Sequence, residues 1–467
     1  MTTPTPYSAF PGALWPAVPQ PAGGALLAIL GQLEQSQFVA PEQLVRVRRP
    51  QLEALLDHSE AALPFWQARL QEVGLDRASR GNAALDQRVW DERWARLPLL
   101  TRPDVQAEGE GLRISALPKG HGDIGETVTS GSSGRPVRIY RSTLDYLYLQ
   151  AFQLREHVWR GRDLSGTFLS IFRDERREHL DESAHLRRMD DWGPPVSVVW
   201  PSGPSVLLDY RAPIDTLIET ICELAPDYLS TFPSLLLEIL RRVRETGKRL
   251  PPLREAIGVG EATSPELTEL CRTLWKAPLA CTYTAYEAGA IAYRCREEER
   301  WHLQSEKSVI EVLDEDGGPC APGETGRVIV TPLHNFAMPL LRYEIGDLAT
   351  VGAGDCACGR KLPTLDDIPG RARDLLMLEN GDLRPPYYGH GAVMQVRAIR
   401  QHQVVQTALG QISFRLVVAR PLSEDEERHV ITAASEALGG GFRVRLEYVD
   451  EIVRGPAGKF AEFERQF

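Results

Sequence analysis

The stretch that decides the fold covers residues 127–136 and has the sequence Thr-Val-Thr-Ser-Gly-Ser-Ser-Gly-Arg-Pro. A β-like run enters it, and another, residues 137–140, leaves it. Its glycines permit a tight loop with exposed backbone N–H groups, and its hydroxyls and arginine add further donors. Such a loop suits a polyphosphate, although the Walker spacing G-x4-G-K-[ST] is absent. A Ser/Gly-rich hairpin turn is the alternative interpretation.

The whole chain has the composition of a globular protein, with 467 residues, a formal net charge of −11 and 43% hydrophobic residues. This length exceeds one ordinary hydrophobic core and predicts two or more domains. The acidic balance provides no positive field for phosphates, which argues against nucleic acid as a partner. Pro16, Pro19 and Pro21 interrupt the one apolar stretch near the N-terminus. We therefore expect no export signal, no membrane span and a cytoplasmic location.

Residues 127–351 alternate short β-like runs with amphipathic stretches. This alternation is typical of an α/β fold in which helices cover mixed sheets. We expect one large domain over residues 1–370, in which the Pro-rich residues 1–22 form a loosely held arm. The β-like runs include residues 166–172 and 228–232, and the helical stretches include residues 212–224 and 234–244.

The last hundred residues have a different pattern. Residues 412–418 and 442–448 each alternate apolar and polar side chains, which predicts two strands. Between them, Ser423 and Glu426 form a capping-box sequence that opens an amphipathic helix, and three glycines at 439–441 end it. We therefore expect a small α+β domain over residues 371–467.

A second candidate site follows the glycine turn Gly258-Val-Gly-Glu261 and has the sequence Tyr283-Thr-Ala-Tyr-Glu287. A tyrosine ring can stack on a nucleotide base, and a glutamate can hold a divalent metal ion. Gly260, Glu261 and Tyr283 are therefore candidate nucleotide-binding residues, and Glu287 is a candidate Mg²⁺ ligand. A Tyr and a Glu this close in sequence usually carry no such function.

Three further short sequences carry candidate charged residues. Asp347 follows a glycine in Leu341-Arg-Tyr-Glu-Ile-Gly-Asp347, where a carboxylate can accept hydrogen bonds from the two hydroxyls of a ribose. Arg371 lies in Gly-Arg-Ala-Arg-Asp at the expected domain boundary. Lys459 lies in Gly-Pro-Ala-Gly-Lys, a flexible loop from which a lysine can reach another domain. The alternatives are an exposed turn carboxylate and solvated cations.

The chain has seven cysteines and no export signal, so we expect no disulfide framework. Cys356 and Cys358 are close in sequence, and Cys295 and His302 are candidate partners for them. Three thiolates and one imidazole suit a closed tetrahedral Zn²⁺, which would be structural. Free thiols beside a surface loop and an ordinary histidine are the alternative.

Five of the short sequences described above resemble, in their order and spacing, those of the adenylate-forming superfamily, and most closely those of its phenylacetate–CoA ligase-like branch. They are residues 127–136, 283–287, 341–347, 370–374 and 455–459. The resemblance covers the chain from about residue 60 onward. Cys356-Ala-Cys-Gly-Arg360 before the Gly-Arg sequence, and His402-Gln-Val-Val-Gln406 near the start of the small domain, also resemble that branch. The resemblance implies a large multi-sheet domain with a small mobile lid domain.

The resemblance also implies a role for each candidate residue. Tyr283 would stack on adenine, Glu287 would bind Mg²⁺ and act in catalysis, and Asp347 would bind the ribose. Arg371 would bind ribose or phosphate, and Lys459 would be the catalytic lysine. The ATP phosphates would be held by Thr129, Ser130, Gly131, Ser132, Ser133, Gly134 and Arg135.

The implied activity is that of an AMP-forming ligase. A carboxylic acid, expected to be an aryl or short acyl acid, would react with ATP to give an acyl-adenylate and pyrophosphate. The acyl group would then pass to coenzyme A. Mg²⁺ and a structural Zn²⁺ are the implied metals, and a homodimer is compatible with the sequence.

Three positions depart from the family pattern and leave other interpretations open. Thr284 and Tyr286 replace smaller residues around the adenine and acyl positions, and Arg373 replaces the usual hinge aspartate. The acyl acceptor could instead be an amine or a carrier-protein thiol, or AMP itself could be transferred. A non-catalytic nucleotide-binding scaffold is a further alternative. Phe172, Trp200 and Phe232 are candidates for the wall of the acid pocket.

Overall fold

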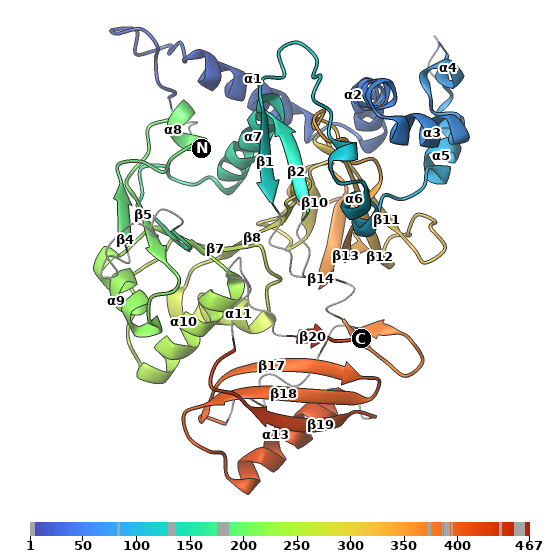
Figure 1. Cartoon of the computed structure of the whole chain (residues 1–467). Coiled ribbons are helices and arrows are strands. Elements are labelled where there is room, and N and C mark those ends of the chain that lie inside the picture. Colours follow the sequence, from blue (N-terminus) through green and yellow to red (C-terminus); the bar gives the residue numbers. More distant parts are fainter. Residues whose placement is uncertain are drawn as a thin grey trace. The chain divides into compact units, whose positions relative to one another are not determined.

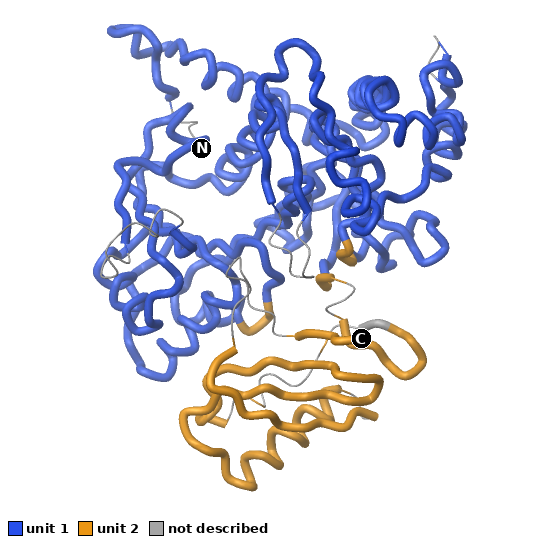
Figure 2. Tube along the Cα trace, viewed as in Figure 1, with its two compact units in different colours: residues 1–263, 267–345, 349–368 blue, residues 264–266, 346–348, 369–467 orange. Residues whose placement is uncertain are grey.

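The structure is a computed structural model that describes residues 5–81, 85–128, 137–174, 186–371, 375–384, 386, 393, 396–438, 441–452 and 463–467. The chain divides into two compact units (Figure 2). The main stretch of the second unit begins at Pro369, close to the expected boundary after residue 370. The first unit comprises residues 1–263, 267–345 and 349–368, and the second comprises residues 264–266, 346–348 and 369–467.

The first unit begins with helices and continues as alternating strands and helices (Figure 1). Its helical elements are α1 (Pro21–Ser36), α2 (Pro41–Ala62), α3 (Pro64–Val73), α4 (Arg77–Arg80), α5 (Gln87–Arg96), α6 (Arg102–Glu108), the 3₁₀ turn Gly109–Leu112, α7 (Thr143–Arg160), α8 (Val196–Val199), α9 (Ile214–Leu224), α10 (Pro233–Thr246), α11 (Pro265–Leu270) and the π-helical turn Cys271–Trp275.

The strands of the first unit form one large sheet and one separate hairpin. They are β1 (Ile124–Val128), β2 (Arg138–Ser142), β3 (Phe168–Phe172), β4 (Leu186–Met189), β5 (Ser205–Asp209), β6 (Tyr228–Thr231), β7 (Glu255–Val259), β8 (Leu279–Ala285), β9 (Gly289–Arg294), β10 (Trp301–Leu303), β11 (Ser308–Leu313), β12 (Thr325–Pro332), β13 (Tyr343–Val351) and β14 (Thr364–Arg371).

The N-terminal helices begin where the sequence supplies starting signals. Pro21, Pro41 and Pro64 stand in the first turns of α1, α2 and α3, where a missing N–H costs nothing. The apolar faces of α2 and α3 then pack on the strands through fully buried side chains such as Leu56 and Trp66. Helix α1 instead packs with α7 and α8.

The described residues build a twelve-stranded sheet in the order β11-β12-β13-β14-β10-β9-β8-β7-β6-β3-β5-β4. Strands β5, β3, β6, β7 and β8 run parallel, and β4 and β9 flank them in antiparallel fashion. The fully buried apolar faces of α9 and α10 pack on the parallel strands. The predicted mixed α/β class is therefore confirmed, because β-like and helical patterns alternate as a parallel sheet requires.

The hairpin β1–β2 has a register in which Val128 pairs with Arg138. Both strands confirm the β-like runs on either side of the candidate phosphate loop. Residues 129–136, which connect them in sequence, lie outside the described residues.

The second unit contains a four-stranded sheet in the order β19-β18-β17-β20 among its described residues. Helix α13 begins at the predicted capping box, since Ser423 Oγ accepts the Glu426 N–H and the Glu426 carboxylate accepts the Ser423 N–H. Fully buried Phe414 and Val430 join sheet and helix, which confirms the α+β prediction. Gly439 and Gly440 lie outside the described residues. The elements are β15 (Leu376–Met377), β16 (Leu383–Arg384), β17 (Ile399–Ala408), β18 (Gln411–Val418), α13 (Glu424–Ala437), β19 (Arg443–Tyr448) and β20 (Phe463–Arg465).

A buried arginine fixes the segment before β13. Arg342 is 2% exposed, and its Nη1 donates to the carbonyl oxygens of Ala95 and Leu97, each at 2.7 Å. Its Nη2 donates to Glu311 Oε1 at 3.0 Å. Arg342 thus satisfies carbonyls at the C-terminal end of α5 and ties them to β11 and β13.

We expect Arg342→Ala to destabilise the protein by about 3–5 kcal/mol, because it leaves the half-buried Glu311 carboxylate and several carbonyl oxygens without their donor. Thermal or urea unfolding would measure the loss. Arg327→Ala is the matched control, since Arg327 on the neighbouring strand pairs with Glu344 at a partly exposed site. Equal effects of the two changes would contradict this role for Arg342.

Candidate functional site

The ends of the parallel strands gather the predicted nucleotide residues. The carboxyl ends of parallel strands meet at one edge of a sheet, where α/β proteins bind ligands. Gly260 and Glu261 follow β7 there, and Tyr283 lies near the end of β8. Gly260 has φ +77°, a conformation that glycine adopts without strain. The structure thus brings the two turns together on neighbouring strands.

Glu261 has a structural contact that sequence reasoning missed. Its Oε2 accepts the N–H of Ser234 at 2.9 Å, in the first turn of α10. A carboxylate at this place satisfies a donor that the helix cannot pair internally. Phe232 and Pro233 open this helix and have no side-chain acceptor for its first N–H groups. That absence could have indicated that a residue distant in sequence caps the helix.

The turn between β8 and β9 holds Glu287 in a buried position. Glu287 is 8% exposed, whereas the side chains of Thr284 and Tyr286 are exposed. The Tyr286 carbonyl accepts a hydrogen bond from the guanidinium of Arg141, and Arg141 is itself paired with the buried Asp145 of α7. Arg141 therefore anchors the backbone directly beside Glu287.

Two further residues contact the Glu287 carboxylate, and both use the same oxygen. The Tyr343 hydroxyl donates to Oε1 at 3.3 Å, and Arg102 Nη1 lies 3.8 Å from Oε1. Burial and the neighbouring Glu287 raise the pKa of Tyr343, so the hydroxyl keeps its proton and donates. A buried carboxylate at this position fits Mg²⁺, a cation that binds oxygen ligands.

The candidate ribose residues also lie together. Arg371 Nε, at the end of β14, is 3.5 Å from Asp347 Oδ1 on β13. The Asp347 side chain is 14% exposed and the Arg371 side chain 41%. Two residues from separate short sequences, both predicted to bind the nucleotide, are therefore close to each other in the structure.

Several predicted residues cannot be placed. Thr129, Ser130, Gly131, Ser132, Ser133, Gly134, Arg135, Arg373 and Lys459 lie outside the described residues. Their assignments therefore stay predictions.

The three aromatic candidates for the acid pocket separate into two groups. Phe172 and Phe232 follow neighbouring parallel strands and meet edge to face, with ring centroids 5.1 Å apart. Trp200 is 1% exposed and packs in the cluster of α1, α7 and α8. Trp200 therefore serves packing among the helices, whereas the position of the Phe172–Phe232 pair at the edge of the strands is compatible with a pocket wall.

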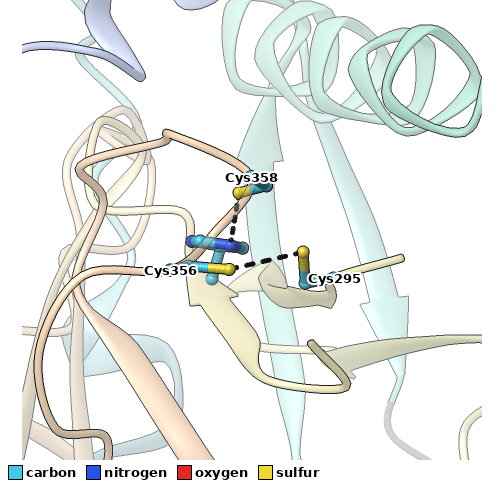
Figure 3. A group of neighbouring side chains, drawn as sticks. Cys295, Cys356 and Cys358 are labelled. Carbon is cyan, nitrogen blue, oxygen red and sulfur yellow. Dashed lines mark hydrogen bonds between the residues drawn. The ribbon is translucent and has the colours of Figure 1, made fainter. Parts of the chain in front are cut away.

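The candidate zinc ligands converge in the first unit. Cys356 Sγ lies 3.6 Å from Cys295 Sγ, and Cys358 Sγ lies 3.3 Å from His302 Nε2 (Figure 3). One ligand atom from each of the four residues lies within 4.8 Å of all the others. Three sulfurs and one imidazole nitrogen at this spacing fit the donor set of a tetrahedral zinc site.

Burial and hydrogen bonds shift the pKa values of three of the four side chains. Burial, followed by the charge of Arg360, lowers the pKa of His302 to about 4, so its imidazole is neutral and can offer a lone pair at pH 7. Burial raises the pKa of Cys356 to about 12. Burial opposes the thiolate of Cys358 too, but hydrogen bonds from Arg360 and the neighbouring thiols outweigh it and lower its pKa.

Comparison with known sequences gives one family match and one curated relative. A family model described as the CapK C-terminal domain matches residues 390–464. A phenylacetate-coenzyme A ligase from Thermus thermophilus is 27% identical over 147 residues, which are 30% of this chain and 33% of that ligase.

Over the aligned segment, this chain is similar to a phenylacetate–CoA ligase. The predicted resemblance to the phenylacetate–CoA ligase-like branch is thereby confirmed. The aligned segment spans only about a third of the curated ligase.

Solved structures of two CoA ligases have a similar fold. A 2-hydroxyisobutyryl-CoA ligase in the postadenylation state, in complex with R3-HIB-AMP, has a TM-score of 0.71 at 16% identity, covering 93% of this chain and 92% of that chain. The anthranilate CoA ligase AuaEII in complex with anthranoyl-AMP has a TM-score of 0.54 at 17% identity, covering 74% and 68%. Among the described helices of this chain, none is long and apolar enough to cross a bilayer.

Proposed function

We propose that this protein activates a carboxylic acid with ATP, forming an acyl-adenylate and pyrophosphate, and then transfers the acyl group to coenzyme A. The observation that carries the proposal is the Glu287 carboxylate, which is buried in the turn that follows β8, the strand of the predicted adenine residue Tyr283. The fold, shared over nearly the whole chain with a CoA ligase solved with R3-HIB-AMP, supports it.

The chemistry requires two anions to meet. One carboxylate oxygen of the acid attacks the α-phosphorus of ATP, the bond to the β-phosphate oxygen breaks, and pyrophosphate leaves. A Mg²⁺ ion held by Glu287 would neutralise charge on the phosphates. Residues 129–135 would bind phosphate oxygens through backbone and hydroxyl donors, Asp347 would accept hydrogen bonds from the ribose, and Arg371 would hold Asp347 in place. Lys459 would bind where the incoming carboxylate and the α-phosphate meet.

The second step replaces AMP by a thiol. The sulfur of coenzyme A attacks the acyl carbon, AMP leaves, and the thiol proton passes to solvent or to AMP. We favour coenzyme A as the acceptor because the solved structures with a similar fold include CoA ligases, one of them with CoA and 2-HIB-AMP bound. We favour a compact aryl or short acyl acid because the paired rings of Phe172 and Phe232 would narrow a pocket at the ends of their strands.

Isotope exchange between ATP and pyrophosphate, measured with a panel of aryl and short-chain acids, tests this function. Exchange that depends on one acid, followed by a thioester with added coenzyme A, is the expected result. Acid-dependent exchange without a thioester would indicate an amine or carrier-protein acceptor. No exchange with any acid, despite ATP binding, would favour a nucleotide-binding scaffold.

We expect Asp347→Ala to weaken ATP binding by about 1.5–3 kcal/mol, because the ribose hydroxyls lose a charged acceptor. Titration calorimetry with ATP would measure it. Glu344→Ala is the matched control, since Glu344 lies on the same strand and pairs with Arg327 instead. Unchanged ATP affinity in Asp347→Ala would make Asp347 an ordinary turn residue.

We expect Lys459→Ala to slow acyl-adenylate formation about a hundredfold or more, the scale of one lost charge-stabilising donor. Transfer from a supplied acyl-adenylate to coenzyme A should stay nearly intact, because no α-phosphate is attacked in that step. Single-turnover measurements of both steps distinguish the two, with Arg428→Ala on the exposed face of α13 as the control for the second unit. Equal damage to both steps would rule out this role.

We also propose that Cys295, His302, Cys356 and Cys358 hold one structural Zn²⁺. With four protein ligands no coordination position is open, so the ion would stabilise the fold and take no part in catalysis. It would join the ends of β9 and β10 to the loop between β13 and β14, and so fix the start of the strand that carries Arg371.

Protein purified after expression with zinc should carry about one zinc per chain. The double change Cys356→Ser, Cys358→Ser should remove the metal and lower the midpoint of thermal unfolding, because metal-binding free energy contributes to folding. The double change Cys222→Ser, Cys320→Ser is the control, since both thiols lie outside the cluster. Wild-type protein without zinc in metal analysis would end the proposal.

A further inference from the structure

Arg102 is a cation at the candidate metal carboxylate that no sequence pattern predicted. It is the first residue of α6, and its Nη1 lies 3.8 Å from Glu287 Oε1. Its side chain is 28% exposed, in contrast to 3% for the structural Arg342. The contact is longer than a hydrogen bond, so the guanidinium neutralises Glu287 without being fixed to it.

The start of α6 is held without the Arg102 side chain. Thr101 and Asp104 form a complete capping box, and Pro103 occupies the first turn. Helix α6 therefore has its own starting signals, and replacing Arg102 leaves them in place.

The segment that carries Arg102 packs beside the strand that follows the candidate phosphate loop. Glu110, in the 3₁₀ turn after α6, accepts a hydrogen bond from the Tyr140 hydroxyl of β2, and the Arg113 guanidinium lies 4.8 Å from the Tyr140 ring centroid. The short segment from Arg102 to Arg113 thus contacts both the metal carboxylate and the hairpin that the sequence associates with polyphosphate.

A metal ion and a guanidinium on the same carboxylate repel each other unless an anion lies between them. The triphosphate of ATP is such an anion, and it would bring the metal with it. The contacts of Arg102 Nη1 and of the Tyr343 hydroxyl described above are both with Oε1, so we assign Oε2 to the metal.

We propose that Arg102 is a phosphate-binding residue for the pyrophosphate portion of ATP, and that it neutralises Glu287 while no nucleotide is bound. This rests on the proposed function, in which Glu287 holds the metal of ATP. During adenylation the β- and γ-phosphates become the pyrophosphate leaving group, and Arg102 accepts part of their negative charge. No proton or bond of Arg102 changes.

The test measures two affinities that the proposal moves in opposite directions. In Arg102→Met, affinity for inorganic pyrophosphate, titrated with a metal chelator present, should fall about tenfold or more, the scale of one charged hydrogen bond. Affinity for Mn²⁺ without nucleotide, followed by electron paramagnetic resonance, should rise, because a repelling cation is gone. Arg102→Lys should restore most of the pyrophosphate affinity.

Arg113→Met is the matched control, because it removes the same charge from the same segment and its partner is Glu110. It should change neither affinity. Thermal unfolding of each variant checks that it is folded. If Arg102→Met is unstable, the pyrophosphate and Mn²⁺ affinities are measured in Arg102→Lys instead. A fall in both affinities would mean that Arg102 only supports the shape of the site, and no change in pyrophosphate affinity would overturn the proposal.

Glu287→Gln separates this proposal from the function on which it rests. Loss of Mn²⁺ binding in that variant is expected. If Mn²⁺ binding persists, the metal role of Glu287 fails, whereas the chelated pyrophosphate titration still tests Arg102 alone.

Discussion

The parallel direction of five neighbouring strands is the constraint on which the rest of the large unit depends. Parallel strands require crossover helices, and α9 and α10 supply the apolar faces that bury the sheet. The same direction places the ends of β3, β6, β7 and β8 at one edge. Phe172 and Phe232, which are distant in sequence, contact each other there for this reason.

Buried arginines then hold the turns near that edge in place through hydrogen bonds to backbone carbonyl oxygens. Arg141 holds the Tyr286 carbonyl, and Arg342 holds the end of α5 next to the strand that carries Tyr343 and Asp347. Each guanidinium has several donors in a rigid fork, so one side chain can satisfy backbone oxygens and a carboxylate at once. A turn secured in this way can present a carboxylate such as Glu287 without filling the space in front of it.

Much of this arrangement could be predicted from the sequence, because its signals are local. The alternation between residues 166 and 244, and the capping box of Ser423 and Glu426, each reflect the preferences of a few neighbouring residues. The contacts of Arg102 with Glu287 and of Glu261 with Ser234 could not, since they join segments whose proximity exists only in the folded sheet. The sequence could single out four side chains that converge in the structure, because cysteines are rare enough to be counted.

At Arg342, the backbone conformation favours glycine, whereas the hydrogen bonds of the side chain require arginine. Its backbone has φ +47°, a region that costs a side-chain-bearing residue about 1–3 kcal/mol and costs glycine little. Its guanidinium, however, makes bonds that glycine cannot make. Arg342→Gly would remove the backbone strain but also the hydrogen bonds of the guanidinium. A shorter polar residue would keep the strain and could make only part of those hydrogen bonds. The site is therefore a local compromise that single substitutions cannot improve, which makes it a poor target for stabilising engineering.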